Sequence, residues 1–266
     1  MKLCYVNINA EETSEPLFRL LDSLFHKVLR ADTEVSIKSV APGLNRALDL
    51  HPYFYFLNKR SIIERIIEAE KEGFDAAVVG CFWDPGVREA RATVNIPVIG
   101  IGEASMLFAC FLGDKFAIVS LNEPSLLPEI DAEIKAYGLE QRTISNPVRS
   151  IKMSTYDVFT KGMENPTLVA QDVLERTKEC VADRADVVIV GCNGLGPLCT
   201  LTNVVKVEDG DVPILDCTSI GLKMAESIHE ISGRLGIPFR SRATVHALPK
   251  QKDLKRVRQL FGLEST

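Results

Sequence analysis

The sequence lacks the features of secreted, membrane-spanning and metal-binding proteins. No uninterrupted apolar run reaches the ~18 residues of a membrane span. The first residues enter a strand-like run without the apolar core and small-residue cleavage site of a signal peptide. The seven cysteines contain no Cys-x-x-Cys pair and no even, closely spaced framework, which argues against disulfide scaffolds and zinc sites. We therefore expect a cytoplasmic protein with reduced thiols and no metal.

The sequence also has few histidines, no excess of basic over acidic residues and no nucleotide-binding glycine motif. The four histidines fall in no motif, and a net charge of −5 gives no general basic field for nucleic acid. Gly100 and Gly102 are not part of a G-x-G-x-x-G that follows a strand; instead they suggest a close backbone approach or a hinge. We expect a small-molecule substrate, and neither a nucleic-acid nor a membrane partner.

The chain does contain a repeated unit. Asp75-Ala-Ala-Val-Val-Gly-Cys81 returns as Asp186-Val-Val-Ile-Val-Gly-Cys192, and the two aspartates, like the two cysteines, are 111 residues apart. Each copy is typical of a short buried parallel strand that ends in Gly-Cys. We predict an α/β fold of two pseudo-symmetric, doubly wound, Rossmann-like lobes with parallel sheets. Because ligands bind at the carboxyl ends of such strands, the active site is expected in the cleft between the lobes.

Alternating strands and helices precede both repeats. We assign residues 1–102 plus 218–266 to the first lobe, with Cys81, and residues 103–217 to the second, with Cys192. The basic tail is expected to pack on the first lobe, and Glu103 to cap a helix that begins at residue 104. The predicted strands are 2–9, 34–40 and 116–120, the predicted helices 14–30, 62–73, 128–137 and 166–182, and a variable stretch covers 145–156.

Two thiols on opposite sides of one carbon suit racemisation without a cofactor. One thiolate removes a proton from a carbon acid, and the other thiol returns a proton to the opposite face. Each cysteine precedes a turn that can start a helix, where backbone N–H groups favour the thiolate and can hold a substrate oxygen. A single cysteine at the end of a buried strand is more often a packing residue. The repetition of the unit is what favours a functional role.

Four segments around the two cysteines match motifs of a known enzyme family. They are Cys81-Phe-Trp-Asp-Pro-Gly86, Asn95-Ile-Pro-Val-Ile-Gly-Ile-Gly-Glu-Ala104, Leu112-Gly113 before Phe116-Ala-Ile-Val, and Val190-Gly-Cys192-Asn-Gly-Leu195. From residue 6 to about residue 226 the chain resembles the aspartate/glutamate/hydantoin racemase superfamily, and most of all the hydantoin and allantoin racemases. The resemblance implies two lobes that close over the substrate, with Cys81 and Cys192 as the acid/base pair. The residues expected to contact the substrate are Asn9, Phe82, Ser120, Asn193 and Gly194.

We therefore predict a cofactor-independent racemase of a 5-substituted hydantoin or a related ring such as allantoin, and expect a homo-oligomer. Cys192-Asn193-Gly194 lacks the Thr-His or Thr-Glu that follows the second cysteine in glutamate and aspartate racemases, which favours a neutral cyclic substrate. One alternative is an amino-acid racemase or a maleate-isomerase-like enzyme, in the latter of which Cys81 attacks carbon. Another is a non-catalytic protein that binds a small molecule.

Overall fold

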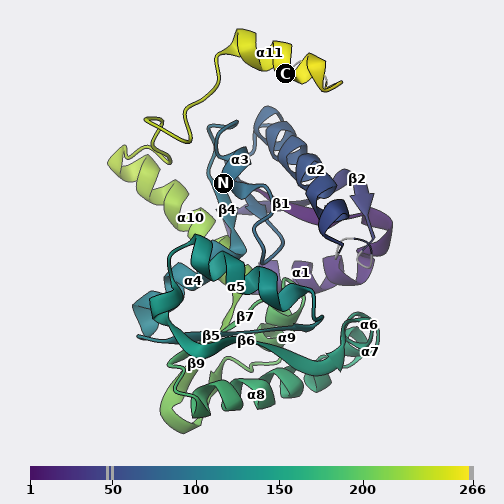
Figure 1. The fold of residues 1–266 in the computed structure, drawn as a ribbon, viewed down its shortest axis with the longest axis vertical. Coiled ribbons are helices and arrows are strands. Elements are labelled where there is room, and N and C mark those ends of the chain that lie inside the picture. Colours follow the sequence, from purple (N-terminus) through teal and green to yellow (C-terminus); the bar gives the residue numbers. More distant parts are fainter. Residues whose placement is uncertain (46–47, 49–50, 264–266) are drawn as a thin grey trace.

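Two parallel β-sheets form the two lobes of the computed structural model, which describes residues 1–45, 48 and 51–263 (Figure 1). Across these ranges the first sheet has strand order β2-β1-β3-β4 and the second β6-β5-β7-β9-β8, with only the β8–β9 pair antiparallel. The order 2-1-3-4 recurs as 6-5-7-9, so the predicted pair of doubly wound α/β lobes is confirmed. The strands are β1 (Lys2–Asn9), β2 (Glu34–Leu44), β3 (Ala76–Val79), β4 (Val98–Gly100), β5 (Phe116–Asn122), β6 (Thr143–Ser154), β7 (Val187–Val190), β8 (Lys206–Val207) and β9 (Val212–Asp216).

Helices connect these strands, as expected for parallel neighbours. In α1 the buried Leu17, Leu21 and Leu24 recur at helical spacing, and Pro16 stands in the first turn. The helices are α1 (Glu15–Val28), α2 (Pro52–Lys71), α3 (Val87–Ala90), α4 (Ile101–Leu112), α5 (Leu126–Ala136), α6 (Thr155–Phe159), α7 (Lys161–Glu164), α8 (Pro166–Ala182), α9 (Leu195–Leu201), α10 (Cys217–Leu235) and α11 (Gln251–Leu260). Within the described ranges, no helix is both long enough and apolar enough to cross a membrane.

The two sheets share one central core. Alternate strand residues face it, among them Tyr5 of β1, Val78 of β3, Ile118 of β5 and Ile189 of β7, together with apolar side chains of α1, α4, α5 and α10. The residues between them face a separate outer core in each lobe, under α2 in the first and α8 in the second. Each sheet is therefore covered on both faces, which explains its nearly continuous apolar strands.

The repeated aspartates stand just before the two central strands. The Asp75 carboxylate accepts the backbone N–H of Lys2 at 2.7 Å. The Asp186 carboxylate accepts the N–H groups of Asp114 at 3.1 Å and Lys115 at 2.9 Å. Each carboxylate thus binds the backbone where the neighbouring strand, β1 or β5, begins.

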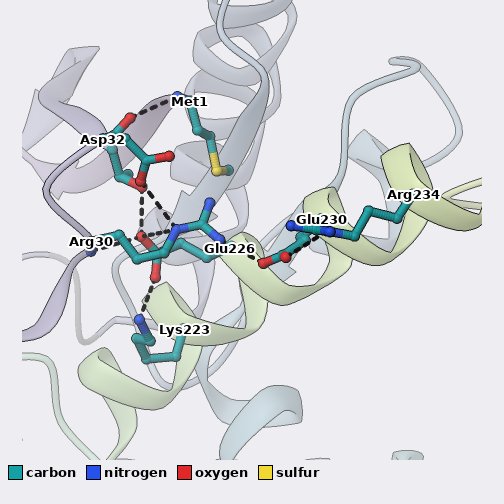
Figure 2. A network of polar contacts seen from close by, with 8 residues as sticks. Met1, Arg30, Asp32, Lys223, Glu226, Glu230 and Arg234 are labelled. Carbon is teal, nitrogen blue, oxygen red and sulfur yellow. Dashed lines mark hydrogen bonds and ion pairs between the residues drawn. The ribbon is translucent and has the colours of Figure 1, made fainter.

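Helix α10 returns from the second sheet to the first lobe, and Figure 2 shows the polar network that holds it there. Glu226 is only 2% exposed and accepts the N–H of Arg30 at 3.0 Å and the hydroxyl of Thr33 at 2.6 Å, while Lys223 donates to it at 2.5 Å. Although burial alone would raise the pKa of Glu226, these donors lower it. The carboxylate therefore fixes α10 to the segment between α1 and β2.

The C-terminal tail continues over the first lobe, as expected. Arg242 donates to the backbone carbonyls of Arg91, at 2.7 Å, and Val94. Arg258 of α11 makes two hydrogen bonds to Glu64 of α2, at 2.9 and 2.7 Å. The exact lobe limits, 1–102 plus 218–266 and 103–217, stay a prediction.

Three expectations about regular structure were wrong. The helix expected over 62–73 is α2, which begins at Pro52. The strand expected to end at residue 40 runs to Leu44, with a register shift against β1. The stretch 145–156, taken as variable, is mostly the edge strand β6. Residues 41–44 and the stretch 145–154 both lack the regular apolar alternation that marks a strand in sequence.

Candidate active site

The two cysteines occupy equivalent places in the two lobes. Gly80 N–H donates to the Val6 carbonyl at 2.9 Å, and Gly191 N–H donates to the Val119 carbonyl at 2.8 Å, so strand pairing ends at the glycine in both copies. Cys81 and Cys192 are therefore the second residues beyond β3 and β7, directly after these glycines, at the predicted carboxyl ends. Cys81 is partly exposed and Cys192 is 6% exposed.

The glycine before each cysteine makes room for a side chain of the central core. A Cβ at Gly80 would lie 2.6 Å from the Tyr5 ring. A Cβ at Gly191 would lie 2.7 Å from Ile118 Cγ2 and 3.2 Å from Phe82 Cδ1 and Cε1. No side chain fits at these distances, which explains why glycine stands in both copies.

Phe82 connects the two cysteine loops across the lobes. It directly follows Cys81, is 3% exposed, and places its ring against Gly191, the residue directly before Cys192. The two cysteines thus belong to segments that touch one another, although they are far apart in the sequence. This contact brings the two copies of the Gly-Cys unit next to one another. That the two thiols face one substrate from opposite sides stays a prediction.

The Cys192 loop is held by hydrogen bonds within its own lobe. The N–H of Gly194 donates to the Cys192 Sγ at 3.4 Å, and the Ser120 hydroxyl donates to the Gly191 carbonyl at 2.8 Å. An N–H donor favours the thiolate over the thiol. Asn193 is 8% exposed, and Gly194 packs under the Phe159 ring, where a Cβ would lie 2.6 Å from Cε1.

The Cys81 loop is held by a buried carboxylate instead. Asp84, which adopts a left-handed φ of 46°, accepts the N–H groups of Gly102 at 3.0 Å and Glu103 at 2.7 Å, and the Tyr137 hydroxyl at 2.8 Å. A Cβ at Gly100 would overlap the Asp84 carboxylate, and one at Gly102 would overlap the Phe82 carbonyl. The close backbone approach suggested by these glycines is confirmed.

Two details of this loop differ from expectation. Cys81 does not precede a helix directly, since α3 begins only at Val87 and is four residues long. Glu103 does not cap a helix from residue 104: α4 begins at Ile101, Asp84 binds the free N–H groups of its first turn, and the Glu103 carboxylate pairs with Arg91. The cap of α4 comes from a loop that is distant in sequence, whereas capping rules consider only the residues next to the helix start.

Asp84 belongs to a buried acidic cluster between the lobes. Burial raises the pKa of Asp84 to about 7, although the N–H groups of Glu103 and Gly102 and the Tyr137 hydroxyl favour its charged form. Burial and the charge of Asp84 also raise the pKa of Glu133 on α5 well above its usual range. Glu133 Oε2 is buried and accepts no hydrogen bond from the described residues. The three donors to Asp84 favour its charged form, whereas Glu133 has no such donor, so a proton in the cluster is favoured on Glu133 over Asp84.

Tyr5 is a site neighbour that sequence reasoning missed. It is fully buried, and its hydroxyl lies beside the side chains of Asn193 and Thr218, which favour the phenolate but do not offset the rise in pKa that burial causes. A side chain of the first lobe thus reaches the second cysteine loop. Its only signal in the sequence is that a bulky residue stands on β1, the strand that pairs with β3.

Asn9, the remaining residue expected to contact the substrate, ends β1 and is 4% exposed. The Asn7 amide donates to the Asn9 carbonyl at 2.9 Å and to the Ser14 hydroxyl at 3.0 Å, which fixes this strand end. In the described ranges no group of three or more His, Cys, Asp or Glu side chains could hold a metal ion. The substrate contacts of Asn9, Phe82, Ser120, Asn193 and Gly194 stay predictions.

Other cysteines of the chain behave as packing residues. Burial raises the pKa of the Cys4 thiol to about 12 and that of Cys180 to about 11. Burial also raises the pKa values of Cys199 and Cys217. A thiol that stays protonated at neutral pH is neither a base nor a nucleophile.

Comparison with known proteins places these observations in a family. The profile described as Asp/Glu/Hydantoin racemase matches residues 8–225. A hydantoin racemase of Pseudomonas sp. (strain NS671) is 26% identical over 266 residues, covering 100% of this chain and 99% of that protein. A hydantoin racemase of Rhizobium meliloti is 28% identical over 192 residues, covering 72% of this chain and 73% of that protein. The solved allantoin racemase from Klebsiella pneumoniae has the same fold, with a TM-score of 0.76, 24% identity and 94% of each chain covered.

Proposed function

This chain belongs to the Asp/Glu/hydantoin racemase family, and from that premise we propose that it is a cofactor-independent racemase of a 5-substituted hydantoin or a related ring such as allantoin. The names of the hydantoin racemases that it resembles support the reaction class. The observation that carries the proposal is the contact between Phe82 and Gly191, which joins the residue after Cys81 to the residue before Cys192.

In the proposed mechanism Cys81 and Cys192 are the two acid/base groups. The thiolate of one removes the proton at C5 of the ring, and the thiol of the other donates a proton to the opposite face of C5. The electron pair left at C5 is delocalised onto the adjacent ring carbonyl until the second proton arrives. No proton is gained or lost overall, but the two sulfurs end with their protonation states exchanged. Each enantiomer is thus the substrate for one of the two states.

The surroundings of Cys192 support its role as a base. The Gly194 N–H donates to its sulfur, and such a donor stabilises the thiolate. We propose that the amides of Asn9 and Asn193 bind the ring, since an amide offers both the donor and the acceptor that a ring of alternating N–H and C=O groups requires. Phe82 packs against Gly191 and Ser120 donates to the Gly191 carbonyl, so we propose that they position the loops in addition to their predicted contact with the substrate.

Racemisation in D₂O tests the proposal. We expect Cys81→Ser and Cys192→Ser each to lower the rate at which an L-hydantoin loses optical rotation by about a thousandfold, because general acid/base groups contribute that order of rate. Each variant should still exchange C5–H for deuterium in only one enantiomer, the one whose proton faces the remaining thiol. Cys110→Ser is the matched control, since Cys110 lies on α4 and donates to the Met106 carbonyl; it should keep full activity.

The same assay separates the alternatives. Full activity in either active-site variant would rule out the two-thiol mechanism. Racemisation of aspartate or glutamate in place of hydantoins and allantoin would assign the protein to the amino-acid racemases. A covalent substrate adduct at Cys81, seen by mass spectrometry, would indicate attack on carbon. Binding without turnover of any of these compounds would leave a non-catalytic binding protein.

A further inference from the structure

A small cavity lies where the C-terminal tail meets the first lobe. Its volume is about 230 Å³, and it is lined by residues 91, 94–97, 238–240 and 242. None of these residues belongs to the candidate active site. Three arginines line the cavity, Arg91 from the end of α3 and Arg240 and Arg242 from the tail.

Two of these arginines are already engaged. Arg91 pairs with Glu103 and donates to the Val98 carbonyl at 3.0 Å. Arg242 donates to backbone carbonyls, among them that of His246 at 2.7 Å, and carbonyls leave its charge unneutralised. Arg240, by contrast, makes neither a hydrogen bond nor an ion pair with any residue in the described part of the chain. One carboxylate therefore faces three guanidinium groups.

Burial and repulsion among the basic groups lower the pKa values of Arg240 and His246. Burial lowers the pKa of Arg240, as do the charges of Arg91 and Arg242, and only Glu103 opposes them. The pKa of His246 is lowered by burial and then by the arginines, Arg88 of α3 among them. His246 Nδ1 is buried and has no hydrogen-bond partner in the described ranges. Although the protein has a net charge of −5, positive charge is concentrated at this cavity. The repulsion among these groups lowers the stability of the folded protein, and a bound anion would reduce that repulsion.

We propose that this cavity is a binding site for a small oxyanion with two or more negative charges, of the phosphate or polycarboxylate class. Arg240 is its main ligand, because the planar guanidinium can donate two parallel hydrogen bonds to such a group. The volume is below the roughly 300 Å³ at which pockets for drug-sized ligands begin, so a compact anion fits better than a nucleotide.

Thermal unfolding of the full chain tests this site. Phosphate, pyrophosphate and citrate are added at constant ionic strength, with chloride and acetate as monovalent anions. We expect a saturable rise in Tm with at least one multivalent anion and none with the monovalent ones. Comparison of pyrophosphate with citrate decides between the phosphate and polycarboxylate classes.

Variants of the tail locate the effect. Arg240→Gln should weaken the apparent Kd by about tenfold, because it removes a charge-assisted bidentate contact, and without ligand it should be at least as stable as the wild type, because repulsion is relieved. Arg256→Gln is the matched control: Arg256 is exposed on α11, in the same tail and outside the cavity, and it should bind like the wild type. Binding should also raise the pKa of His246, followed by NMR of its ring.

Three results would overturn the proposal. The first is the absence of a saturable response to all three multivalent anions. The second is an Arg240→Gln variant that binds them as tightly as the wild type. The third is a loss of Tm in ligand-free Arg240→Gln, which would make Arg240 a structural residue of the tail. None of these measurements depends on racemase activity.

Discussion

The loops after Cys81 and Cys192 follow equivalent strands but are held in different ways. The Cys192 loop is bound inside the second lobe, by the Gly194 N–H to its sulfur and by the Ser120 hydroxyl to its backbone. The Cys81 loop is bound through Asp84 to the first turn of α4 and to Tyr137, next to the α5 helix of the second lobe. One loop therefore depends on neutral hydrogen bonds, and the other on a buried carboxylate.

A duplicated sequence unit therefore need not place its two thiols in equivalent surroundings. Neutral donors to the Cys192 loop do not change between pH 5 and 9, whereas burial raises the pKa of Asp84 to about 7, within that range, and also raises the pKa of Glu133. We expect the geometry of the Cys81 side to be the more sensitive to pH. The contact between Phe82 and Gly191 is where the two loops meet, and removing it should affect both.

Gly191→Ala is the change with the largest expected effect. The new Cβ would lie 2.7 Å from Ile118 Cγ2 and 3.2 Å from the Phe82 ring, so Phe82 must move and take the Cys81 loop with it. We expect the racemisation rate to fall by about a hundredfold, since displacements of about 1 Å have that effect. The free energy of unfolding, measured in urea, should fall by about 1–3 kcal/mol, the usual cost of overpacking.

Gly233→Ala is the control for this change. Gly233 lies within α10, and no atom lies within 4 Å of a Cβ built there. Alanine should stabilise the helix by about 0.5–1 kcal/mol and leave the activity unchanged. If Gly191→Ala behaved like Gly233→Ala, the two loops would not determine each other's position.

Glu133→Gln tests whether the acidic cluster of Asp84 and Glu133 makes stability depend on pH. Because the pKa of Glu133 in the folded protein is raised above its ordinary value of 4.5, the unfolding free energy of the wild type falls as pH rises from about 4.5 to the raised pKa. Glutamine cannot ionise, so the variant should match the wild type near pH 5 and be more stable by about 1–2 kcal/mol near pH 9, where a shift of one pKa unit corresponds to ~1.4 kcal/mol. Urea unfolding at both pH values measures this difference.

Glu129→Gln is its control, because Glu129 is exposed on the same helix. It should leave the pH dependence nearly unchanged. A Glu133→Gln variant with the wild-type pH profile would mean that Glu133 does not carry the proton, and the pH dependence of the Cys81 loop would then rest on Asp84 alone.

Local patterns in the sequence predicted the parts of the fold that are built from local contacts. The Gly-Cys repeat placed both cysteines at strand ends, and the spacing of Leu17, Leu21 and Leu24 predicted α1. Strand β6 was missed because Asn146-Pro147 interrupts its pattern, and because an edge strand with one open side needs no apolar alternation.

The supports of the candidate site were beyond sequence reasoning for a different reason. Tyr5, Glu133 and Tyr137 come from β1, from α5 and from the residue after α5, and only the packing of one lobe on the other brings them to the cysteine loops. Asp84 was visible in a motif, but its role as the cap of α4 depends on a glycine approach that the fold creates. Contacts between lobes leave no periodic signal along the chain.

The smallest expected effect concerns the opposite ends of the same two strands. Asp186 binds two backbone N–H groups and Asp75 one, so Asp186→Ala should cost about 1 kcal/mol and Asp75→Ala about half as much, at the net value of a hydrogen bond at an exposed site. Urea unfolding measures both, with Asp22→Ala on the exposed face of α1 as a control expected to change stability by less than ~0.5 kcal/mol. Racemase activity should survive in all three, because the cysteines lie at the other ends of β3 and β7. Equal losses of unfolding free energy for Asp75→Ala and Asp186→Ala would mean that the number of backbone donors does not set what each aspartate contributes. The two copies of the unit would then differ only around their cysteines.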